Sequence, residues 1–266
     1  MGDALRPSGK GRKAIIVGNG RVPVADALPP GTLEGAGFVI AADGGALQAI
    51  RIGLRPDVAV GDGDSLAPGD LALLAEMGIP FRHVPAEKDE SDLELAVRLA
   101  LASGAAEVVI LAALEGPRIE HSLASLSLLA LPELAGRPAS LVDERSTIRL
   151  LTAEAANGRL TLSGETGDYV SLLPWGGDVE GVTTEALRYP LIDEPLTVGP
   201  SRGLSNELTT AKATVRLRRG RLLVVHTRRA SLREPLLPAP GAEDTTGTTD
   251  APGETLAPTR AGRERS

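Results

Sequence analysis

The sequence predicts a two-domain protein, with an N-terminal α/β domain built on a mostly parallel sheet and an all-β C-terminal domain. Up to about Asp143, short β-branched runs alternate with helical stretches, which is typical of a parallel sheet flanked by helices. Beyond this point, strand-like segments follow one another without an intervening helix. With 266 residues and 42% hydrophobic content, the chain can bury one large core or two ordinary ones.

The first half contains six predicted strands and four predicted helices. We expect the strands at Ala14–Gly18, Phe38–Ala42, Asp57–Val60, Phe81–Val84, Glu107–Ala112 and Ser140–Val142. We expect the helices at Ala46–Ile52, Asp70–Met77, Asp92–Ala102 and Ile119–Leu131. The helix from Asp92 has the clearest start, because Ser91 and Glu94 have the spacing of a capping box before an apolar face.

The second half reads as strands joined by turns. The predicted strands are Thr147–Thr152, Arg159–Ser163, Tyr169–Leu173, Ala186–Tyr189, Ala213–Arg218 and Arg221–Thr227. Asn157-Gly158 and Arg219-Gly220 mark turns between them. From about Leu237 the chain is rich in Pro, Gly, Thr and Ala, which predicts disorder. The predicted organisation is therefore an α/β domain at 1–143, an all-β domain at 144–232 and a disordered tail at 233–266.

The overall composition excludes several classes of protein. The chain has no cysteine, so it has no disulfide, no thiolate metal site and no cysteine nucleophile. Its net charge of -7 and its aromatic content of 2% argue against a nucleic-acid partner. No apolar run is long enough to span a membrane, and the first residues lack the apolar core of a secretory signal. We expect a soluble protein in the cytoplasm.

Charged residues follow four consecutive strands of the predicted parallel sheet. Ligands of such sheets bind at the carboxyl ends of the strands, so these residues are expected to share one site. They are Asp43; Asp62 and Asp64; Lys88, Asp89 and Asp92; and Glu115, Arg118, Glu120 and His121.

The residue types at this edge favour phosphate chemistry with a magnesium ion. Asp62 and Asp64, together with a third aspartate from a neighbouring loop, offer the oxygen ligands that Mg²⁺ prefers. Lys88 and Arg118 supply positive charge for a polyphosphate. Gly44 and Gly45 would let backbone N–H groups approach a ligand closely at the start of a helix. Phosphoryl-type transfer needs mainly positioning and charge neutralisation, which this set provides.

Each residue also has a plainer interpretation. The negative charge of Asp92 could do no more than interact favourably with the dipole at the start of its helix. The Asp62–Asp64 segment could be a simple turn, and Lys88 and Arg118 could be solvated surface charges. His121 fits a helix face or a pocket better than a metal site, because no second histidine stands at ligand spacing. The prediction of a site therefore depends on the coincidence of these residues.

The motifs resemble those of one family, the thiamine pyrophosphokinases, over roughly Ile15 to Thr227. In the first half they are Ala42–Ala46 (ADGGA), Pro56–Ser65 (PDVAVGDGDS), Lys88–Ala96 (KDESDLELA) and Gly116–Leu129 (GPRIEHSLASLSLL). In the second half they are Val170–Pro174 (VSLLP), Ala186–Leu191 (ALRYPL) and Gly203–Glu207 (GLSNE). Seven matches in the right order make the resemblance specific.

The resemblance implies a Rossmann-like N-terminal domain that binds ATP, a C-terminal β-sandwich and a homodimer. It implies that the hydroxyl of thiamine attacks the β-phosphorus of Mg-ATP, giving thiamine diphosphate and AMP. Carried over by position, the metal residues are Asp62, Asp64 and Asp92, and the catalytic residues are Asp43, Asp92, Lys88 and Arg118. The nucleotide-binding residues are Asp43, Gly44, Gly45, Lys88, Arg118 and His121. Ser205 and Asn206 would lie near thiamine, contributed by the partner subunit.

Trp175, the only tryptophan, has two interpretations. A rigid aromatic ring could stack on the cationic ring system of thiamine, which makes this residue a candidate for substrate binding. A position in a core or an interface is the plainer alternative.

The chain departs from the family pattern at three places in the site. Gly63 stands where an aromatic residue is usual, and in a later motif Pro117 replaces a glycine and Glu120 an aspartate. The third and smaller change is Ser125, which stands where an asparagine is usual. These changes leave room for a different small alcohol as acceptor, or for a non-catalytic thiamine or nucleotide sensor. Hydride transfer fits poorly, because the glycine loop beginning at Gly18 has Pro23 in place of its third glycine.

Overall fold

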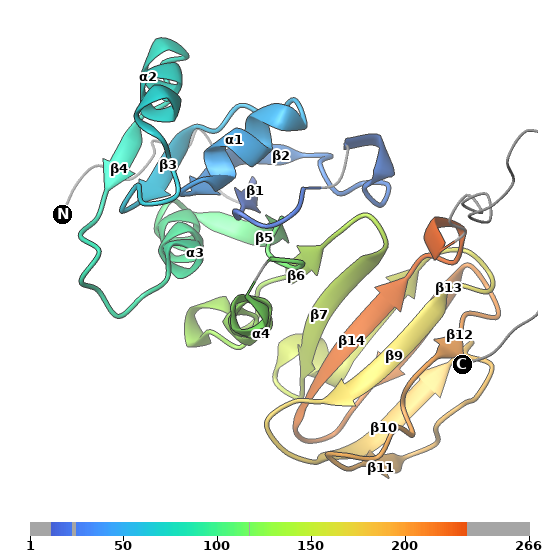
Figure 1. Cartoon of the computed structure of the whole chain (residues 1–266). Helices are drawn as coiled ribbons and strands as arrows, with labels where there is room; N and C mark the ends of the chain where they lie inside the picture. Colours follow the sequence, from blue (N-terminus) through green and yellow to red (C-terminus); the bar gives the residue numbers. More distant parts are fainter. Residues whose placement is uncertain (1–11, 23–24, 117, 233–266) are drawn as a thin grey trace, which may run out of the picture. The chain divides into compact units, whose positions relative to one another are not determined.

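A computed structural model describes residues 12–22, 25–116 and 118–232, and their strands form two sheets (Figure 1). The strands of the first half are β1 (Arg12–Val17), β2 (Ala36–Ala42), β3 (Val58–Gly61), β4 (Phe81–His83), β5 (Ala105–Leu111) and β6 (Ala139–Val142). Its α-helices are α1 (Gly45–Arg51), α2 (Pro68–Glu76), α3 (Asp92–Ala102) and α4 (Ile119–Leu128). Every predicted strand and helix of this half is confirmed, with ends within three residues of the prediction.

The strands of the second half are β7 (Ser146–Thr152), β8 (Arg159–Ser163), β9 (Tyr169–Pro174), β10 (Val179–Glu185), β11 (Glu194–Leu196), β12 (Asn206–Glu207), β13 (Lys212–Arg216) and β14 (Arg221–Thr227). Short 3₁₀ helices lie at η1 (Ala25–Ala27), η2 (Pro132–Leu134), η3 (Ala155–Gly158) and η4 (Ala230–Leu232). The two predicted turns have the expected backbone, since Asn157, Gly158 and Gly220 all have positive φ.

The larger sheet has ten strands in the order β12-β9-β14-β7-β6-β5-β1-β2-β3-β4. Its strands from β6 to β4 pair in parallel, and those from β12 to β7 pair antiparallel. The smaller sheet is antiparallel, in the order β11-β10-β13-β8. The fold is therefore mixed α/β, with a large mostly parallel sheet and an antiparallel sheet, as the sequence predicts at this level.

The two halves share the larger sheet across the predicted boundary at Asp143. Strands β6 and β7 pair antiparallel, with Leu141 opposite Ile148 and Val142 opposite Thr147. The described residues all belong to one compact unit. The division into domains at 1–143 and 144–232 stays a prediction, and the tail at 233–266 lies outside the described residues.

Helix α3 contributes to the larger core through one apolar face. Its buried residues are Ala96, Val97, Leu99 and Ala100. The Ser91 hydroxyl accepts a hydrogen bond from the backbone N–H of Glu94 at 3.2 Å, which caps the first turn as predicted. Because α3 packs against β1, β2, β3 and β5, its first residue is held beside the ends of these strands.

The predicted strand Ala186–Tyr189 is wrong, and β10 precedes it. Ala186 has a φ of 58°, a left-handed conformation that interrupts a strand, and only Leu187 makes a bridge, to Leu208. The alternating pattern of β10 is obscured by Gly181, where the pairing with β11 is irregular. Strands β11 and β12 are also absent from the prediction, because runs of three and two residues carry too little periodicity.

No helix in the described part of the chain is long and apolar enough to cross a membrane.

Candidate active site

Three aspartates meet beyond the carboxyl ends of neighbouring parallel strands. Asp43 directly follows β2, Asp62 directly follows β3, and Asp92 is the first residue of α3. One carboxylate oxygen from each lies within 4.8 Å of the others. The predicted convergence of acidic side chains from separate loops is therefore present, and its members are Asp43, Asp62 and Asp92.

Asp43 organises the loop that follows β3. Its side chain is buried, and its backbone has a φ of 47°, a conformation that aspartate adopts more readily than most residues. Carboxylate oxygen Oδ1 accepts a hydrogen bond from the Gly63 N–H at 2.9 Å, and Oδ2 accepts one from the Ser65 N–H at 3.1 Å. The Ser65 hydroxyl donates a further short hydrogen bond to Oδ2. Asp43 thus fixes the loop that carries Asp62 and Asp64.

Lys88 bridges the other two aspartates of the cluster. Its Nζ lies 3.2 Å from Oδ2 of Asp62 and 3.1 Å from Oδ1 of Asp92. The lysine side chain is 11% exposed. Burial by itself would lower the pKa of Lys88, but the hydrogen bonds to Asp92 and Asp62 outweigh it and raise the pKa. The ammonium group therefore stays charged between two carboxylates.

The two carboxylates paired with Lys88 differ in their proton affinity. A backbone hydrogen bond from the Asp64 N–H, with help from Lys88, lowers the pKa of Asp62. Burial raises the pKa of Asp92, against the opposing effect of Lys88. Apart from its ion pair with Lys88, the buried Oδ1 of Asp92 has no hydrogen-bond partner among the described residues. An acceptor of this kind is available to a cation.

Asp64 lies beside the cluster rather than within it. The negative charge of Asp62 raises the pKa of Asp64, with contributions from burial and from Asp43. Its side chain is exposed, and Asp43 occupies the place in the three-carboxylate group that the sequence assigns to Asp64. The site therefore offers three converging carboxylates and a fourth at its edge.

The donor set fits a magnesium ion. Mg²⁺ prefers carboxylate oxygens and water, and the three converging groups are all carboxylates. Oδ1 of Asp92 is held by Lys88 alone, so this oxygen would have room to face a bound cation as well. The residues that would hold the ion are Asp43, Asp62 and Asp92.

The glycines around the cluster serve close packing. A Cβ on Gly45 would lie 2.1 Å from the Val17 carbonyl oxygen, and one on Gly61 would lie 2.8 Å from Oδ1 of Asp43. The Gly44 N–H donates to the Ser65 hydroxyl at 2.9 Å. Gly44 and Gly45 are predicted to contact a ligand through their backbone, and in the structure their visible role is to let α1 start against β1.

Ser65 is a member of the site that is not among the predicted residues. Its hydroxyl accepts from the Gly44 N–H and donates to Asp43, so it joins the loops after β2 and β3. A single serine after two aspartates carries no distinctive signal in the sequence. Only the pairing of β2 with β3 brings it to Asp43.

Replacing Ser65 with alanine is expected to loosen this connection. The Ser65→Ala variant leaves the Gly44 N–H without its partner and removes one donor to Asp43, which should lower the free energy of unfolding by about 1–2 kcal/mol. Chemical denaturation measures the change. Ser127→Ala is the matched control, because the Ser127 hydroxyl bonds only the Leu123 carbonyl on exposed α4. Equal stabilities for the two variants would contradict the role given to Ser65.

The residues at the start of α4 do not contact the aspartates. The Arg118 side chain is 67% exposed, and its Nε donates to Oε1 of Glu120 at 2.6 Å. This hydrogen bond lowers the pKa of Glu120. His121 is exposed as well, and Pro117 lies outside the described residues. The grouping of Arg118 and His121 with the acidic cluster stays a prediction.

The predicted thiamine residues lie in the second half of the chain. Asn206 is buried, where its Oδ1 accepts from the Tyr189 N–H at 2.9 Å and its Nδ2 donates to the Tyr189 carbonyl at 2.7 Å. Ser205 is exposed, with a left-handed φ of 56°. Trp175 is partly buried against the larger core, which agrees with the plainer alternative for this residue. Asn206 therefore holds the backbone around Tyr189, while Ser205 is open to solvent.

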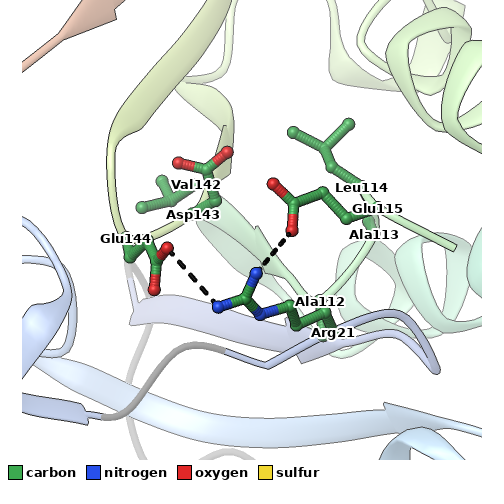
Figure 2. Close-up of a pocket in the computed structure, with 8 residues that line it drawn as sticks. All are labelled: Arg21, Ala112, Ala113, Leu114, Glu115, Val142, Asp143 and Glu144. Carbon is green, nitrogen blue, oxygen red and sulfur yellow. Dashed lines mark hydrogen bonds and ion pairs between the residues drawn. The ribbon is translucent and has the colours of Figure 1, made fainter. Parts of the chain in front are cut away.

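A small pocket lies at the carboxyl ends of β1, β5 and β6 (Figure 2). Arg21 crosses it, with one guanidinium nitrogen 3.4 Å from Glu115 and another 3.8 Å from Glu144. The chain runs outward from β1 to β4 and then returns to β5 on the other side of β1. Ligands of open α/β sheets bind at such a reversal of strand order. Arg21 and Glu144 are not among the predicted site residues.

Comparison with known proteins identifies the chain as an enzyme of the kinase class and gives its family. The profile described as "Thiamin pyrophosphokinase, catalytic domain" matches residues 31–136. A second, described as "Thiamin pyrophosphokinase, vitamin B1 binding domain", matches residues 159–222. The chain belongs to the thiamin pyrophosphokinase family, whose members use ATP to form thiamine diphosphate.

Individual relatives agree with this family. The chain is 27% identical to the thiamine pyrophosphokinase of Bacillus subtilis (strain 168) over 190 residues, which are 71% of this chain and 86% of the relative. The crystal structure of thiamin pyrophosphokinase from Geobacillus thermodenitrificans has 28% identity and a TM-score of 0.68, covering 82% of this chain and 99% of that one. Yeast thiamin pyrophosphokinase, at 13% identity, shares the fold with a TM-score of 0.65 over 86% of this chain and 90% of its own.

Proposed function

We propose that this enzyme transfers the diphosphate group of ATP to the hydroxyl of thiamine in a magnesium-dependent reaction that releases AMP. The observation that carries the proposal is the convergence of Asp43, Asp62 and Asp92 around Lys88 at the carboxyl edge of the parallel strands. Membership of the family supports the choice of ATP and thiamine as substrates.

The chemistry is a displacement at phosphorus. The hydroxyl oxygen of thiamine forms a bond to the β-phosphorus, the bond from that phosphorus to the oxygen bridging the α-phosphate breaks, and AMP leaves with the bridging oxygen. The proton of the hydroxyl is lost as the new bond forms. A bound Mg²⁺ would supply charge neutralisation for the phosphate oxygens.

Some residues of the site would balance charge on the ligands, and others fix the geometry of the site. Asp62 and Asp92 would present oxygens to the cation. Both also hold the Lys88 ammonium group, which would pair with the triphosphate. Asp43 contributes one oxygen and fixes the loop after β3. Arg118 is exposed and paired only with Glu120 in the described structure, so it is free to turn toward a polyphosphate.

Thiamine binding is assigned to the second half of the chain in a homodimer. Ser205 is exposed, and its backbone N–H donates to the Ser171 hydroxyl at 3.1 Å, an arrangement that holds its side chain open to a ligand. We propose that this loop faces the acidic cluster of the partner subunit, with Trp175 as a further candidate contact. We further propose that the enzyme acts in the cytoplasm.

A product assay tests the reaction directly. Purified protein mixed with thiamine, ATP and magnesium is expected to form thiamine diphosphate and AMP in equal amounts, measured by anion-exchange chromatography. EDTA in excess over the magnesium should abolish turnover, and added Mg²⁺ should restore it. ADP in place of AMP would show that a single phosphate is transferred. Undiminished turnover in EDTA would overturn the metal assignment.

A further inference from the structure

A cavity of about 530 Å³ lies away from the aspartate cluster, on the face of the larger sheet that carries Val109 and Val142. Its wall is formed by residues of β5, β6, β7, β8 and β14 and by the segment 29–32. This volume lies within the range of small-molecule sites in proteins. The function proposed above makes no use of it.

Polar side chains line the cavity on a face of the larger sheet that is otherwise apolar. Thr147, Arg149 and Leu151 alternate along β7, so their side chains point to one face. Leu151 is buried in the core shared with the smaller sheet, whereas Thr147 and Arg149 line the cavity. On the neighbouring strands Ser140 and Glu107 line it too. The row of polar residues lies between two apolar cores.

Arg149 is a cation of this cavity that lacks a partner among the described residues. Among the described residues, it makes no hydrogen bond and no ion pair, although it is partly buried. Burial lowers the pKa of its guanidinium, and the nearby charge of Glu107 opposes this only in part. An unpaired cation in such a position is unfavourable unless solvent or a ligand compensates it.

Most of the other charges around the cavity are paired, but the exposed Glu165 carboxylate, which also lines it, makes no ion pair among the described residues. Lys13 lies 3.7 Å from Glu107 and donates to the Gly31 carbonyl at 3.0 Å. Arg228 donates to two backbone carbonyls. Asp168 accepts a hydrogen bond from the Glu165 N–H at 3.0 Å, and its Oδ2 lies 2.9 Å from Nε2 of His226. Among the cations of the cavity, Arg149 is therefore the one that has no hydrogen-bond or ion-pair partner in the described part of the chain.

We propose that this cavity binds a small organic anion whose carboxylate or phosphate group pairs with Arg149. A guanidinium presents a planar fork of donors that matches either group bidentately. The hydroxyls of Thr147 and Ser140 make no hydrogen bond that competes with a ligand in the described structure, and both line the same wall. Val109 and Val142 supply apolar surface for the body of the ligand.

Calorimetric titration of the full chain with model anions tests this proposal. Benzoate, phenyl phosphate and inorganic phosphate are added in turn, without ATP or magnesium. We expect saturable binding at one site by benzoate or phenyl phosphate, weakened about 10-fold or more by Arg149→Leu, the scale of a lost charge-assisted hydrogen bond. The tighter of the two organic ligands identifies the preferred anionic group.

Two control variants test whether the anion binds in this cavity or elsewhere on the protein. Arg219→Leu removes the same charge from a side chain that is 80% exposed and outside the cavity, so it should leave binding unchanged. Lys88→Ala removes the phosphate-facing cation of the aspartate cluster and should also leave benzoate binding unchanged. Loss of binding in Lys88→Ala, with no effect of Arg149→Leu, would assign the anion to the aspartate cluster and overturn the proposal.

Folding of the variants is followed by circular dichroism and thermal melting. Should Arg149→Leu fail to fold, Arg149→Lys and Thr147→Val take its place, because the first keeps the charge without the fork and the second removes one hydroxyl. Each is expected to weaken binding by several-fold. The absence of saturable binding by all three anions would mean that the cavity holds water only, and unchanged affinity in both replacements would reject the role of Arg149.

Discussion

Replacing Asp92 with asparagine is expected to lower turnover by about 10³-fold, the scale seen when a charge-stabilising group at a transition state is removed. The substitution keeps the shape of the side chain but takes a negative charge from the group formed with Asp43 and Asp62. It also leaves Lys88 with one carboxylate instead of two. Steady-state rates of thiamine diphosphate formation at saturating ATP measure the effect.

The fold should survive this change. The Asp92 side chain is 23% exposed, and the start of α3 is capped independently by Ser91. Asp89→Asn is the control from the same loop, because Asp89 is exposed and is not a member of the three-carboxylate group. Near-normal turnover in Asp92→Asn would remove this residue from the site, and an equal loss in Asp89→Asn would point to a general charge effect.

Asp43→Asn is expected to damage both activity and stability. The two carboxylate oxygens of Asp43 together face three donors, from Gly63 N–H, Ser65 N–H and the Ser65 hydroxyl. An amide group must turn its own NH₂ toward at least one of them, which leaves a partly buried donor without its acceptor. We expect a loss of about 3 kcal/mol in the free energy of unfolding and of about 10 °C in the melting temperature.

The contrast between the two aspartate variants is the informative result. Turnover should fall about 10³-fold or more in both, because each contributes an oxygen to the same group. Only Asp43→Asn should also lower the melting temperature, measured by differential scanning calorimetry. Equal melting temperatures for Asp43→Asn and the unaltered protein would contradict its role in fixing the loop after β3.

The fold of the first half is largely predictable because its signals are local. Apolar runs bounded by glycine and proline define the strands, and Ser91 defines the start of α3. Prediction is weaker in the second half. Strand β10 exists through its pairing with β13 and β11, and it contains Gly181, which a local pattern disfavours. Ala186–Tyr189 has the composition of a strand, but the chain turns at Ala186.

The candidate site, too, is predictable from the sequence only in part. Residues that follow parallel strands can be expected at one edge of the sheet, so Asp43, Asp62 and Asp92 are predictable as a group. Which oxygens face one another is decided by the φ of Asp43 and by hydrogen bonds from Gly63 and Ser65. These contacts join residues about twenty positions apart, and no local pattern encodes them.

The sequence by itself determined the family, the order of strands and helices in the first half, and the set of acidic residues from which the site is built. Tertiary structure alone decided that Asp43 rather than Asp64 completes the three-carboxylate group, that Ser65 joins two loops, and that Arg149 stands unpaired beside a cavity. The physical reason is the distance along the chain over which each kind of interaction acts. Propensity, capping and alternation act over a few neighbouring residues, whereas the convergence of side chains depends on strand pairing and on the docking of α3.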